Sequence, residues 1–454
     1  MESIFDIAAD LHTPVSAFLR LAPLRPRYLL ESVEAGHAGR YSFIGFGDCR
    51  RIPVDELTDD RSAPRSGDVL DGLRRALREA PVCEPADTRS TPFTGGLVGV
   101  AAFDLVRRLY KLPPAPHASA VGEGMFVATD SILVFDHLTR RMALLHAGPA
   151  AERVALRAEV IEILRGPLDD PRHTARHQAA TPSMTREGFM AGVERVKERI
   201  SAGDVYQLVL SIRFSGETEV EPFAAYRALR LLNPSPYMYF LDLGDSQVVG
   251  SSPEALARLK GGRAELRPIA GTRRRGDTEE EDRRLERELL GDPKEAAEHV
   301  MLVDLARNDL GRTARPGSVV VEPFRSIERY SHVMHMVSGV SGDVRRGLDA
   351  FDLFAAAFPA GTVTGAPKLK AIEIIDELEP VSRGLYSGSV GYFGHGGSMD
   401  QAITIRTIVF TGEGYSFQAG AGIVADSDPA AEHQEVLSKA AAMEAALEMA
   451  KEGL

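Results

Sequence analysis

The sequence predicts an α+β protein, with antiparallel strands and separate helices in one chain. In its last third, short apolar segments such as L-Y-S-G-S-V-G-Y-F-G and Y-S-F-Q-A-G-A-G-I-V alternate with glycine turns. Sequential strands of this kind most simply form an antiparallel meander. Two further segments, which start at Asp292 and Asp428, have the Asp-Pro beginning that is typical of a capped helix. The length of 454 residues is sufficient for a large buried core.

Composition and charge exclude several classes of protein. The chain carries 53 Lys and Arg against 65 Asp and Glu, a formal net charge of −12, which argues against a nucleic-acid or anionic-membrane surface. Cys49 and Cys83 show no CxxC spacing, so neither a disulfide framework nor a thiolate zinc site is predicted. The first residues are acidic where a signal peptide would be basic, and no apolar run reaches the roughly 18 residues of a membrane helix. We expect a cytoplasmic protein.

The N-terminal part of the chain predicts strands and one helix. Residues 28–47 look like two short strands joined by a glycine-containing turn, and residues 124–146 like two apolar strands. The glycine-rich segment 93–104 is more typical of a tightly packed strand than of a phosphate loop, because no Gly-Lys-Ser/Thr follows it. Residues 150–164 have the apolar spacing of a helix.

A polar stretch rich in Pro, Asp, His and Arg, residues 167–182, is the clearest linker. It divides the chain into an N-terminal region, residues 1–166, and a C-terminal region, residues 183–454. His173 and His177 lie four residues apart in this stretch, but a polar tract flanked by prolines forms a poor helix. We therefore interpret the stretch as a solvated linker rather than as a metal site.

The C-terminal region begins with an amphipathic helix over residues 185–202 and a buried strand up to residue 211. A second helix, residues 222–232, stops at N-P-S-P-Y-M-Y-F, where two prolines end it and an aromatic strand begins. The later segment F-P-A-G-T-V-T-G-A-P-K is similar in composition to a Walker loop. Its spacing fails, because three residues rather than four separate Gly361 from Gly365.

Four carboxylates are the candidates for a metal site. In the first capped helix, Glu295 and Glu298 are three positions apart and project from one face, and the second capped helix repeats this with Glu432, Glu435 and Lys439. Carboxylates brought together raise one another's pKa unless a cation lies between them. An all-oxygen set without His or Cys favours magnesium over zinc. The pattern therefore predicts a Mg2+ site shared by two helices.

Helix capping offers a structural explanation for part of this pattern. Glu295 and Glu432 lie in the first turn of their helices, where an acidic residue completes a capping box or suits the helix dipole. For these two residues the structural explanation is as good as the functional one. Glu298 and Glu435 lie deeper in their helices, so capping explains them less well.

Other polar groups precede or accompany these helices. The backbone N–H groups of Gly420, Ala421 and Gly422, just before the second capped helix, are suited to cradle an anion. Arg406 lies on the neighbouring predicted strand at a position that faces the same side. His332 and His335 lie three residues apart in R-Y-S-H-V-M-H-M-V, and one of the two is a candidate for catalysis, although a histidine hydrogen-bonded inside a core is the ordinary expectation.

Five long motifs follow one another in the C-terminal region: P-I-A-G-T, E-H-V-M-L-V-D-L-A-R-N-D-L-G-R, F-P-A-G-T-V-T-G-A-P-K, Q-A-G-A-G-I-V-A-D-S-D-P and E-H-Q-E-V-L-S-K-A. In this order they resemble the chorismate-utilising enzymes, most closely the large component of anthranilate synthases. The motifs span residues 203–442 and are too long for a chance match. In the N-terminal region, L-L-E-S and R-Y-S-F resemble the same family.

The resemblance implies an α+β fold of two large antiparallel sheets packed as a sandwich, with helices on the outside and chorismate bound together with Mg2+. Glu298 and Glu435 match the metal-ligand glutamates of the family, with Glu295 and Glu432 in support. The ring carboxylate of chorismate is expected at this ion. The further residues that match substrate-contacting positions or are expected to line the same pocket are Tyr386, Arg406, Gly420, Ala421, Gly422, Thr362 and Lys439.

The family chemistry adds ammonia at ring carbon C2, expels the C4 hydroxyl and then eliminates pyruvate to give anthranilate, so the chain is expected to be a lyase. Hydroxide is a poor leaving group, and Glu254 in S-S-P-E matches the position proposed for the acid near C4. His335 matches the histidine associated with pyruvate elimination. Thr272 matches a threonine that contacts the substrate.

Two positions discriminate among members of the family. Salicylate and isochorismate synthases carry a lysine base in the motif that reads G-D-V-Y-Q here, and Gln207 is a poor base for activating water. Aminodeoxychorismate synthases carry a nucleophilic lysine in P-I-K-G-T, whereas this chain has Ala270. Anthranilate synthase is thus favoured. The alternatives are 2-amino-2-deoxyisochorismate synthase, 4-amino-4-deoxychorismate synthase and a non-enzymatic paralogue that only binds a ligand.

The resemblance also implies a regulatory site and a partner. L-L-E-S and N-P-S-P-Y-M-Y-F resemble the tryptophan feedback site of anthranilate synthases, which assigns part of this site to the N-terminal region and chorismate binding to the C-terminal region. Because the chain has no G-x-C-x-G elbow of a glutaminase, we expect a separate glutamine amidotransferase subunit to deliver ammonia. The residues expected around the inhibitor are Glu31, Ser32, Asn233, Pro234, Tyr237 and Met238.

Overall fold

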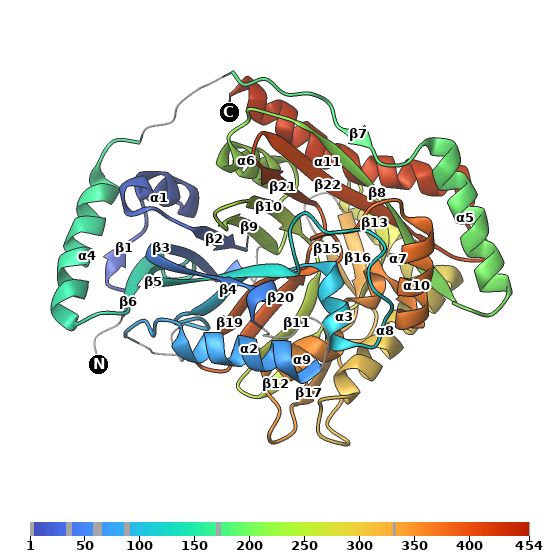
Figure 1. The fold of residues 1–454 in the computed structure, drawn as a ribbon, viewed down its shortest axis with the longest axis horizontal. Coiled ribbons are helices and arrows are strands. Elements are labelled where there is room, and N and C mark those ends of the chain that lie inside the picture. The colour runs from blue at the N-terminus through green and yellow to red at the C-terminus, as the bar shows by residue number, and fades with distance from the viewer. Residues whose placement is uncertain are drawn as a thin grey trace.

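The computed structural model describes residues 4–32, 39–57, 66–85, 91–168, 174–329 and 333–453. Within these residues, 19 strands form one large sheet and three strands form a small one, and every strand pair is antiparallel. Helices cover the outside (Figure 1). The predicted α+β class is confirmed.

The bounds of the elements are as follows. The α-helices are α1 Pro14–Arg20, α2 Ser66–Glu79, α3 Val106–Leu109, α4 Ala150–Arg165, α5 Arg186–Ser201, α6 Pro222–Leu232, α7 Glu279–Gly291, α8 Pro293–Gly311, α9 Ala350–Ala357, α10 Lys368–Leu378 and α11 Pro429–Glu452. The strands of the large sheet are β1 Ile7–Ala8, β2 Tyr28–Glu31, β3 Tyr41–Pro53, β4 Gly96–Ala101, β5 Gly124–Asp136, β6 Arg141–His146, β7 Thr181–Pro182, β8 Gln207–Glu217, β9 Tyr237–Asp242, β10 Gln247–Ser252, β11 Ala255–Lys260, β12 Arg263–Leu266, β14 Val320–Val321, β17 Val340–Asp343, β18 Gly365–Ala366, β19 Ser389–Gly394, β20 Met399–Ile403, β21 Thr407–Thr411 and β22 Gly414–Ile423. The small sheet consists of β13 Ile269–Arg274, β15 Ser326–Arg329 and β16 Val333–Val337.

Strand β5 joins two runs of strands into the large sheet. Its second half pairs with β6, and its first half pairs with β4. From β5, one run continues through β3, β2, β9, β10, β21, β22 and β8, and the other through β4, β19, β20, β11, β12 and β17. The expectation of two separate large sheets is therefore wrong, because both runs of strands belong to one continuous sheet. The 13-residue strands β3 and β5 bend at a bulge between Phe46 and Cys49, so the ladder curls from one run into the other without a break.

The N-terminal and C-terminal regions of the chain contribute strands to the same sheet. Tyr28 of β2 lies opposite Leu241 of β9, and Gly99 of β4 lies opposite Gly391 of β19. A Cβ on Gly99 would lie 2.1 Å from the Met125 carbonyl of β5, and one on Gly391 would lie 2.0 Å from the Asp400 carbonyl of β20, so only glycine allows the close approach of these flanking strands. The predicted division at residues 167–182 stays a prediction.

The segment that follows α4 is more closely packed than a solvated linker. His177 forms a bridge with Thr218, and its side chain is fully buried. The interpretation of the stretch as solvated is therefore wrong at His177, because its ring packs beside Tyr415 and against α11. His173 lies outside the described residues.

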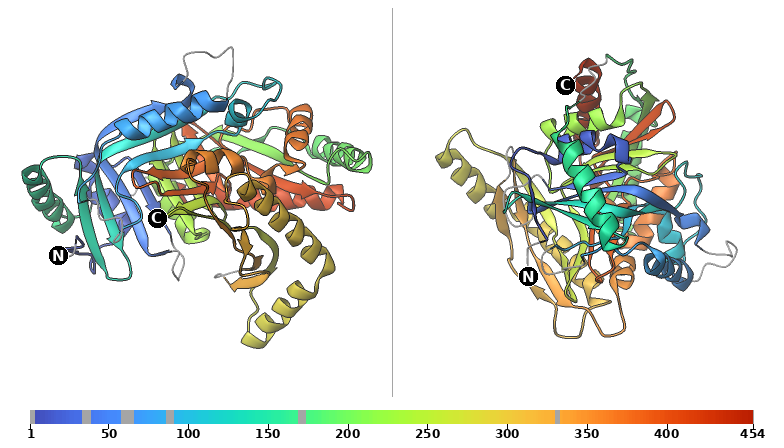
Figure 2. Two further views of the ribbon diagram at one scale, coloured as in Figure 1. Left: turned by 90° about the horizontal axis from the view of Figure 1, so that it is seen from below. Right: turned by 90° about the vertical axis from the view of Figure 1, so that its left-hand side faces the viewer.

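Apolar helix faces build the main core. The face of α11 that carries Val436, Met443 and Leu447 packs against α6 and β22, and α5 packs on the same side. Figure 2 shows α7 projecting from the body of the molecule beside the small sheet, and α8 leads back to pack against α9 and β17. Both long capped helices begin where the sequence predicts, because Asp292 accepts hydrogen bonds from the N–H groups of residues 294 and 295 and Asp428 accepts one from residue 431.

A buried ion pair ties the end of α10 to the sheet. Arg383 Nη2 lies 2.7 Å from Glu379 Oε1, and the same guanidinium donates to the carbonyls of Val363 and Val209. Glu379 also accepts from the Ser211 hydroxyl at 2.7 Å. Because both charged side chains are almost fully buried, removing one leaves the other without compensation.

We expect Arg383→Met to lower the free energy of unfolding by about 3–5 kcal/mol, because it leaves the Glu379 carboxylate buried and unpaired. Urea unfolding followed by circular dichroism measures the change. Arg283→Met is the matched control: its partner Glu279 is 81% exposed, and an exposed i,i+4 pair contributes only about 0.3–0.5 kcal/mol. Equal effects in the two variants would contradict the prediction.

Candidate functional site

A cavity of about 250 Å3 lies among the small sheet, β8, β22 and the first half of α11. It gathers all the predicted catalytic and substrate-binding residues except Ala421 from positions far apart in the sequence. The predicted residues that line it are Glu254, Thr272, His335, Thr362, Tyr386, Arg406, Gly420, Gly422 and Lys439. Their individual roles stay predictions, but their grouping in one cavity is what those roles require.

A glycine bulge places Thr272 beside His335. In the pairing of β13 with β16, the register shifts between Ala270 and Thr272, so that Thr272 lies opposite His335. Gly271 takes φ +67°, and a Cβ there would lie 2.8 Å from Leu289 and 3.0 Å from the Glu295 carboxylate. Only glycine tolerates both this left-handed conformation and this approach. The Gly-Thr dipeptide therefore aims the threonine hydroxyl at the histidine.

The hydrogen bonds of His335 fix its tautomer. Its Nδ1 lies 2.9 Å from Thr272 Oγ1 and 3.4 Å from the Gly271 carbonyl oxygen. A carbonyl only accepts, so Nδ1 carries the proton and Nε2 is the basic nitrogen of the neutral ring. Burial lowers the pKa of His335, and the nearby Arg406 lowers it further. A neutral imidazole at physiological pH is suited to accept a proton.

The pKa of Glu254 is shifted in the opposite direction. Burial raises the pKa of its carboxyl to about 7, although Thr362, Lys439 and Arg406 each act to lower it. No hydrogen bond within 3.5 Å reaches Thr362 Oγ1, so its effect on Glu254 acts over a longer distance. The Glu254 carboxyl is therefore partly protonated near neutral pH, which is the condition for a general acid.

Arg406 and Lys439 are two cations that act on this acid. The side chain of Arg406 is largely buried, and the loss of hydration lowers its pKa while Glu254 raises it. Its backbone takes φ +50°, an unfavourable conformation for an arginine, and its carbonyl accepts the N–H of Ser251. Strain of this kind is concentrated at functional sites. A buried guanidinium beside a cavity is suited to bind a carboxylate.

The strand β22 presents two backbone amides to the cavity. Its residues Gly420 and Gly422 lie opposite Ser211 and Val209 of β8, whose N–H groups donate to Glu379 and to the Thr364 carbonyl rather than to β22. These positions are therefore not hydrogen-bonded across the ladder, and the N–H groups of the two glycines point away from β8.

Ala421 differs from its two neighbours. It takes the intervening ladder position, and its side chain is buried in the core rather than in the cavity. Alternation along the strand thus excludes one of the three predicted amides from the cavity. Lys439 Nζ donates to the Gly420 carbonyl at 3.0 Å, which fixes the lysine at this edge.

Gln418 also lines the cavity, and the sequence-based prediction missed it. It lies two residues before Gly420, and the strand alternation that relates Gly420 to Gly422 would have identified it. Its Nε2 donates to Ser211 at 2.8 Å, while its Oε1 is buried and makes no hydrogen bond. Thr362 Oγ1 is also buried and unpaired. Two such atoms at one cavity indicate that a polar ligand completes the site.

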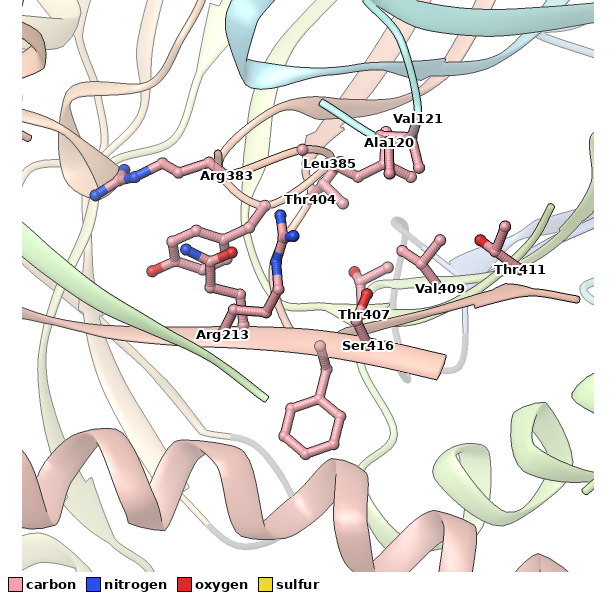
Figure 3. Close-up of a pocket in the computed structure, with 14 residues that line it drawn as sticks. Ala120, Val121, Arg213, Arg383, Leu385, Thr404, Thr407, Val409, Thr411 and Ser416 are labelled. Carbon is pink, nitrogen blue, oxygen red and sulfur yellow. The ribbon is translucent and has the colours of Figure 1, made fainter. Parts of the chain in front are cut away.

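A smaller cavity of about 70 Å3 adjoins the first one and shares Tyr386 and Gln418 with it. Figure 3 shows Arg213 and Arg383 on one side of it and Thr407, Val409 and Thr411 on the other. Glu379 compensates the charge of Arg383, so the positive charge at this cavity comes from Arg213. A cation is therefore disfavoured there.

The predicted metal ligands lie within electrostatic reach of one another. Burial raises the pKa of Glu298, and Glu295, Glu435 and Glu432 raise it further, so both helices bring negative charge to one place. The first-turn residues do not serve only as caps: Glu295 pairs with Arg273 at 2.9 Å, and the pKa of Glu432 is raised by its burial and by Glu435.

An all-oxygen, mutually repelling donor set fits a hard divalent cation. In the described part of the chain, however, no three of these carboxylates have ligand atoms within 4.8 Å of one another. Glu435 instead forms an ion pair of 2.8 Å with Lys439. Side-chain movement would thus have to accompany metal binding, and the assignment stays a prediction.

A separate cavity of about 490 Å3 brings together four of the predicted tryptophan-site residues, Glu31, Ser32, Tyr237 and Met238. Asn233 and Pro234 do not line it, because they belong to the turn before β9 rather than to the strand itself. Glu31 is held by the hydroxyl of Tyr226 and by the guanidinium of Arg230, each at 2.7 Å.

Comparison with known proteins identifies the relatives of the chain. A sequence model of the family described as "chorismate binding enzyme" matches residues 25–445. Anthranilate synthase component 1 of Thermus thermophilus is 47% identical over 98% of this chain and 97% of its own length, and that of Pseudomonas putida is 45% identical over 98% and 94%.

Solved structures agree with these sequence matches. The crystal structure of anthranilate synthase component I from Streptococcus pneumoniae superimposes with a TM-score of 0.79 at 33% identity, over 98% of this chain and all of that one. An isochorismate synthase of Escherichia coli shares the fold, with a TM-score of 0.73 at 20% identity over 96% of this chain and 92% of its own. None of the helices in the described part of this chain is long and apolar enough to span a membrane.

Proposed function

The chain belongs to the chorismate-binding enzyme family, in the branch of anthranilate synthase component 1, and on this premise we propose how its cavity converts chorismate into anthranilate. The enzyme is a chorismate-utilising lyase of tryptophan biosynthesis. The observation that carries the proposal is one cavity that holds an acid with a pKa of about 7, a neutral histidine and a buried arginine.

In the first step, ammonia attacks ring carbon C2, both conjugated ring double bonds shift, and the C4–O bond breaks. Glu254 gives its proton to the departing hydroxyl, which leaves as water, and the new C2 ammonium group loses a proton to become the amine. Ala270 lines the cavity where aminodeoxychorismate synthases have a nucleophilic lysine, so ammonia itself forms the C2–N bond. Gln207, whose amide lies beside Gly422, supplies no base for a water nucleophile.

In the second step, His335 Nε2 accepts the proton on C2. The electron pair of that C–H bond makes the ring aromatic, the bond to the enolpyruvyl oxygen breaks, and pyruvate leaves. Thr272 keeps the Nδ1 proton in place, so that Nε2 stays the basic nitrogen. Arg406 and Tyr386 hold the enolpyruvyl carboxylate during both steps, and the Gly420 and Gly422 amides face the ring carboxylate.

Glu298 and Glu435 would hold Mg2+, with Glu295 and Glu432 in support. The bound ion would supply positive charge to neutralise the ring carboxylate of chorismate. The electrostatic strain on Glu298 supports this assignment, because a cation between the two helices would relieve it.

Incubation with chorismate, MgCl2 and an ammonium salt tests the reaction. We expect a fluorescent anthranilate product together with pyruvate, which lactate dehydrogenase detects independently. Release of a non-aromatic amine that keeps its enolpyruvyl group would instead identify a 2-amino-2-deoxyisochorismate synthase. An amine at C4 would identify a 4-amino-4-deoxychorismate synthase, and a protein that binds chorismate without turnover would be a regulatory paralogue.

The ammonia source is proposed to be a separate glutamine amidotransferase subunit, and the site of action the cytoplasm. The name of the matching relatives, component 1, supports a multi-component enzyme. Glutamine alone should therefore give no product with this chain, and activity with glutamine should appear on addition of the partner subunit.

The 490 Å3 cavity is proposed to bind tryptophan as a feedback inhibitor. Ser32 Oγ is buried at this cavity and has no hydrogen-bond partner, so it is available to a polar group of the inhibitor. We expect Ser32→Ala to weaken inhibition by tryptophan about tenfold, the effect of one hydrogen bond, with turnover unchanged. Asn233→Ala, outside the cavity, should change inhibition less. An inhibition constant unaffected by Ser32→Ala would exclude this role.

A further inference from the structure

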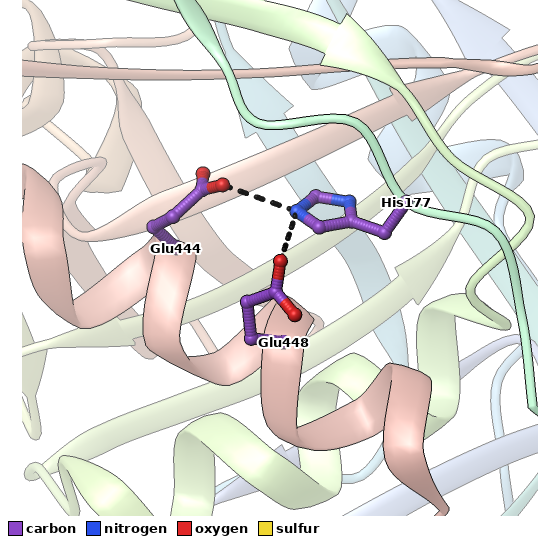
Figure 4. A group of neighbouring side chains, drawn as sticks. All are labelled: His177, Glu444 and Glu448. Carbon is purple, nitrogen blue, oxygen red and sulfur yellow. Dashed lines mark hydrogen bonds and ion pairs between the residues drawn. The ribbon is translucent and has the colours of Figure 1, made fainter.

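A second group of side chains that could hold a metal lies where His177 meets Glu444 and Glu448 of the far half of α11. His177 Nε2 is 3.1 Å from Glu444 Oε1 and 4.0 Å from Glu448 Oε1 (Figure 4). One ligand atom of each of the three lies within 4.8 Å of the others, and no other group in the described residues meets this condition. At 1.5 Å per residue, Glu444 is roughly 14 Å along the helix from Glu435, so this group is separate from the catalytic cavity.

The hydroxyl of Thr218 holds the ring of His177 at Nδ1. This hydroxyl donates to the Arg176 carbonyl, 3.4 Å away, and accepts the N–H of Val220 at 3.1 Å. It also lies 3.2 Å from His177 Nδ1. This contact orients the ring so that Nε2 faces the carboxylates of Glu444 and Glu448.

This arrangement suits a cation. The carboxylates of Glu444 and Glu448 bring negative charge to one nitrogen of a fully buried imidazole, and that nitrogen lies 3.1 Å from the nearer carboxylate oxygen. Lys451 pairs with Glu448 Oε2 at 2.9 Å, which leaves Oε1 of that carboxylate on the histidine side. Tyr415 donates to the Gln178 carbonyl at 2.7 Å, so its hydroxyl hydrogen is also committed elsewhere.

We propose that His177, Glu444 and Glu448 bind one Zn2+ ion. Ligand atoms in a tetrahedral zinc site lie about 3.3 Å apart, and the two N···O distances of 3.1 and 4.0 Å lie on either side of this value. The bond from Nδ1 to Thr218 is the outer-shell contact that orients a metal-binding histidine. Water completes the coordination, since Glu444 and Glu448 are 28% and 45% exposed.

The ion fastens the segment before β7 to the last helix. Besides the histidine, the segment contacts α11 through the N–H of Ala175, which donates to the Lys451 carbonyl at 3.3 Å. The same helix carries Glu432 and Glu435 at its other end. The zinc site therefore has a structural role, and it is independent of the reaction proposed for the catalytic cavity.

Metal analysis of the full chain tests the proposal. To remove competition from the catalytic carboxylates, the parent is the Glu298→Gln/Glu435→Gln variant, stripped with EDTA and dialysed against Zn2+. We expect about one Zn2+ per chain in this parent and a melting temperature that Zn2+ raises by roughly 2 °C or more. Co2+ in place of Zn2+ should give the intense visible absorption of a four-coordinate site.

His177→Gln and Glu448→Gln should each abolish zinc binding, the melting shift and the cobalt absorption. Glu448→Gln changes a half-exposed side chain, so it stays informative if His177→Gln fails to fold. Glu452→Gln, the same change one helical turn further on, should retain all three signals. Zinc content that is unchanged in a folded Glu448→Gln variant, or absent from the parent, would overturn the proposal.

Discussion

Changing Glu298 or Glu435 to Gln should reduce Mg2+-dependent turnover at least about a hundredfold while the fold stays intact. The change removes one charged oxygen donor at nearly constant size, so the core is not disturbed. Burial and three neighbouring carboxylates already raise the pKa of Glu298, and the neutral amide should even relieve that repulsion. We therefore expect loss of activity without loss of stability, a combination that a purely structural role would not produce.

The measurement is the rate of anthranilate formation as a function of Mg2+ concentration, together with a thermal melt. Glu452→Gln, on the same helix as Glu435, is the control and should behave like the wild type. If both Glu298→Gln and Glu435→Gln keep wild-type turnover and the same Mg2+ dependence, the ion is held elsewhere.

Glu254→Gln should lower kcat by about 10²–10⁴-fold, the usual contribution of a general acid. Burial raises the pKa of Glu254 to about 7, so the carboxyl is protonated and competent below that pH. As the pH rises through about 7, the carboxyl loses its proton and the rate falls. His335 acts in the opposite sense: its pKa is lowered, so the base is already neutral and competent at this pH. The plot of wild-type kcat against pH should therefore be bell-shaped, with the falling limb near pH 7.

The pH profile of the residual activity is the decisive measurement. Glu254→Gln should lose the falling limb, whereas His335→Gln should keep it and should accumulate the amino intermediate with its enolpyruvyl group attached. Product analysis by chromatography separates the two effects. A falling limb that persists in Glu254→Gln would assign the acid to another residue.

Local features of the structure were predictable from the sequence because their causes are local. Asp292 and Asp428 cap their helices through backbone groups two or three residues away, and Pro293 and Pro429 occupy the first helical positions, as in the prediction. The bulge at Gly271 that places Thr272 opposite His335 has an equally local cause, but it was not predicted from the sequence. Such features depend on a few neighbouring residues.

Features that depend on contacts between segments far apart in the chain could not be predicted from the sequence. The continuous large sheet arises because β5 pairs with β4 and β6 by different halves, and no local pattern reports this. Ala421 was placed with its glycine neighbours, although the register against β8 turns its side chain into the core. His177 was interpreted as solvated because the tract around it is polar, but Tyr415 and α11, from the far end of the chain, cover it.

The pairing of β9 with β10 has a consequence for regulation. Met238, in the wall of the 490 Å3 cavity, lies directly opposite Ser251, whose N–H donates to the carbonyl of Arg406 at the 250 Å3 cavity. One cross-strand pair and one hydrogen bond thus separate the proposed effector pocket from the strained backbone of Arg406, the residue proposed to bind the substrate. If tryptophan shifts β9, this short connection offers a path to the dihedral angles of Arg406 without a rigid-body rotation. Thermodynamic reciprocity would then make each occupant weaken the binding of the other by the same factor.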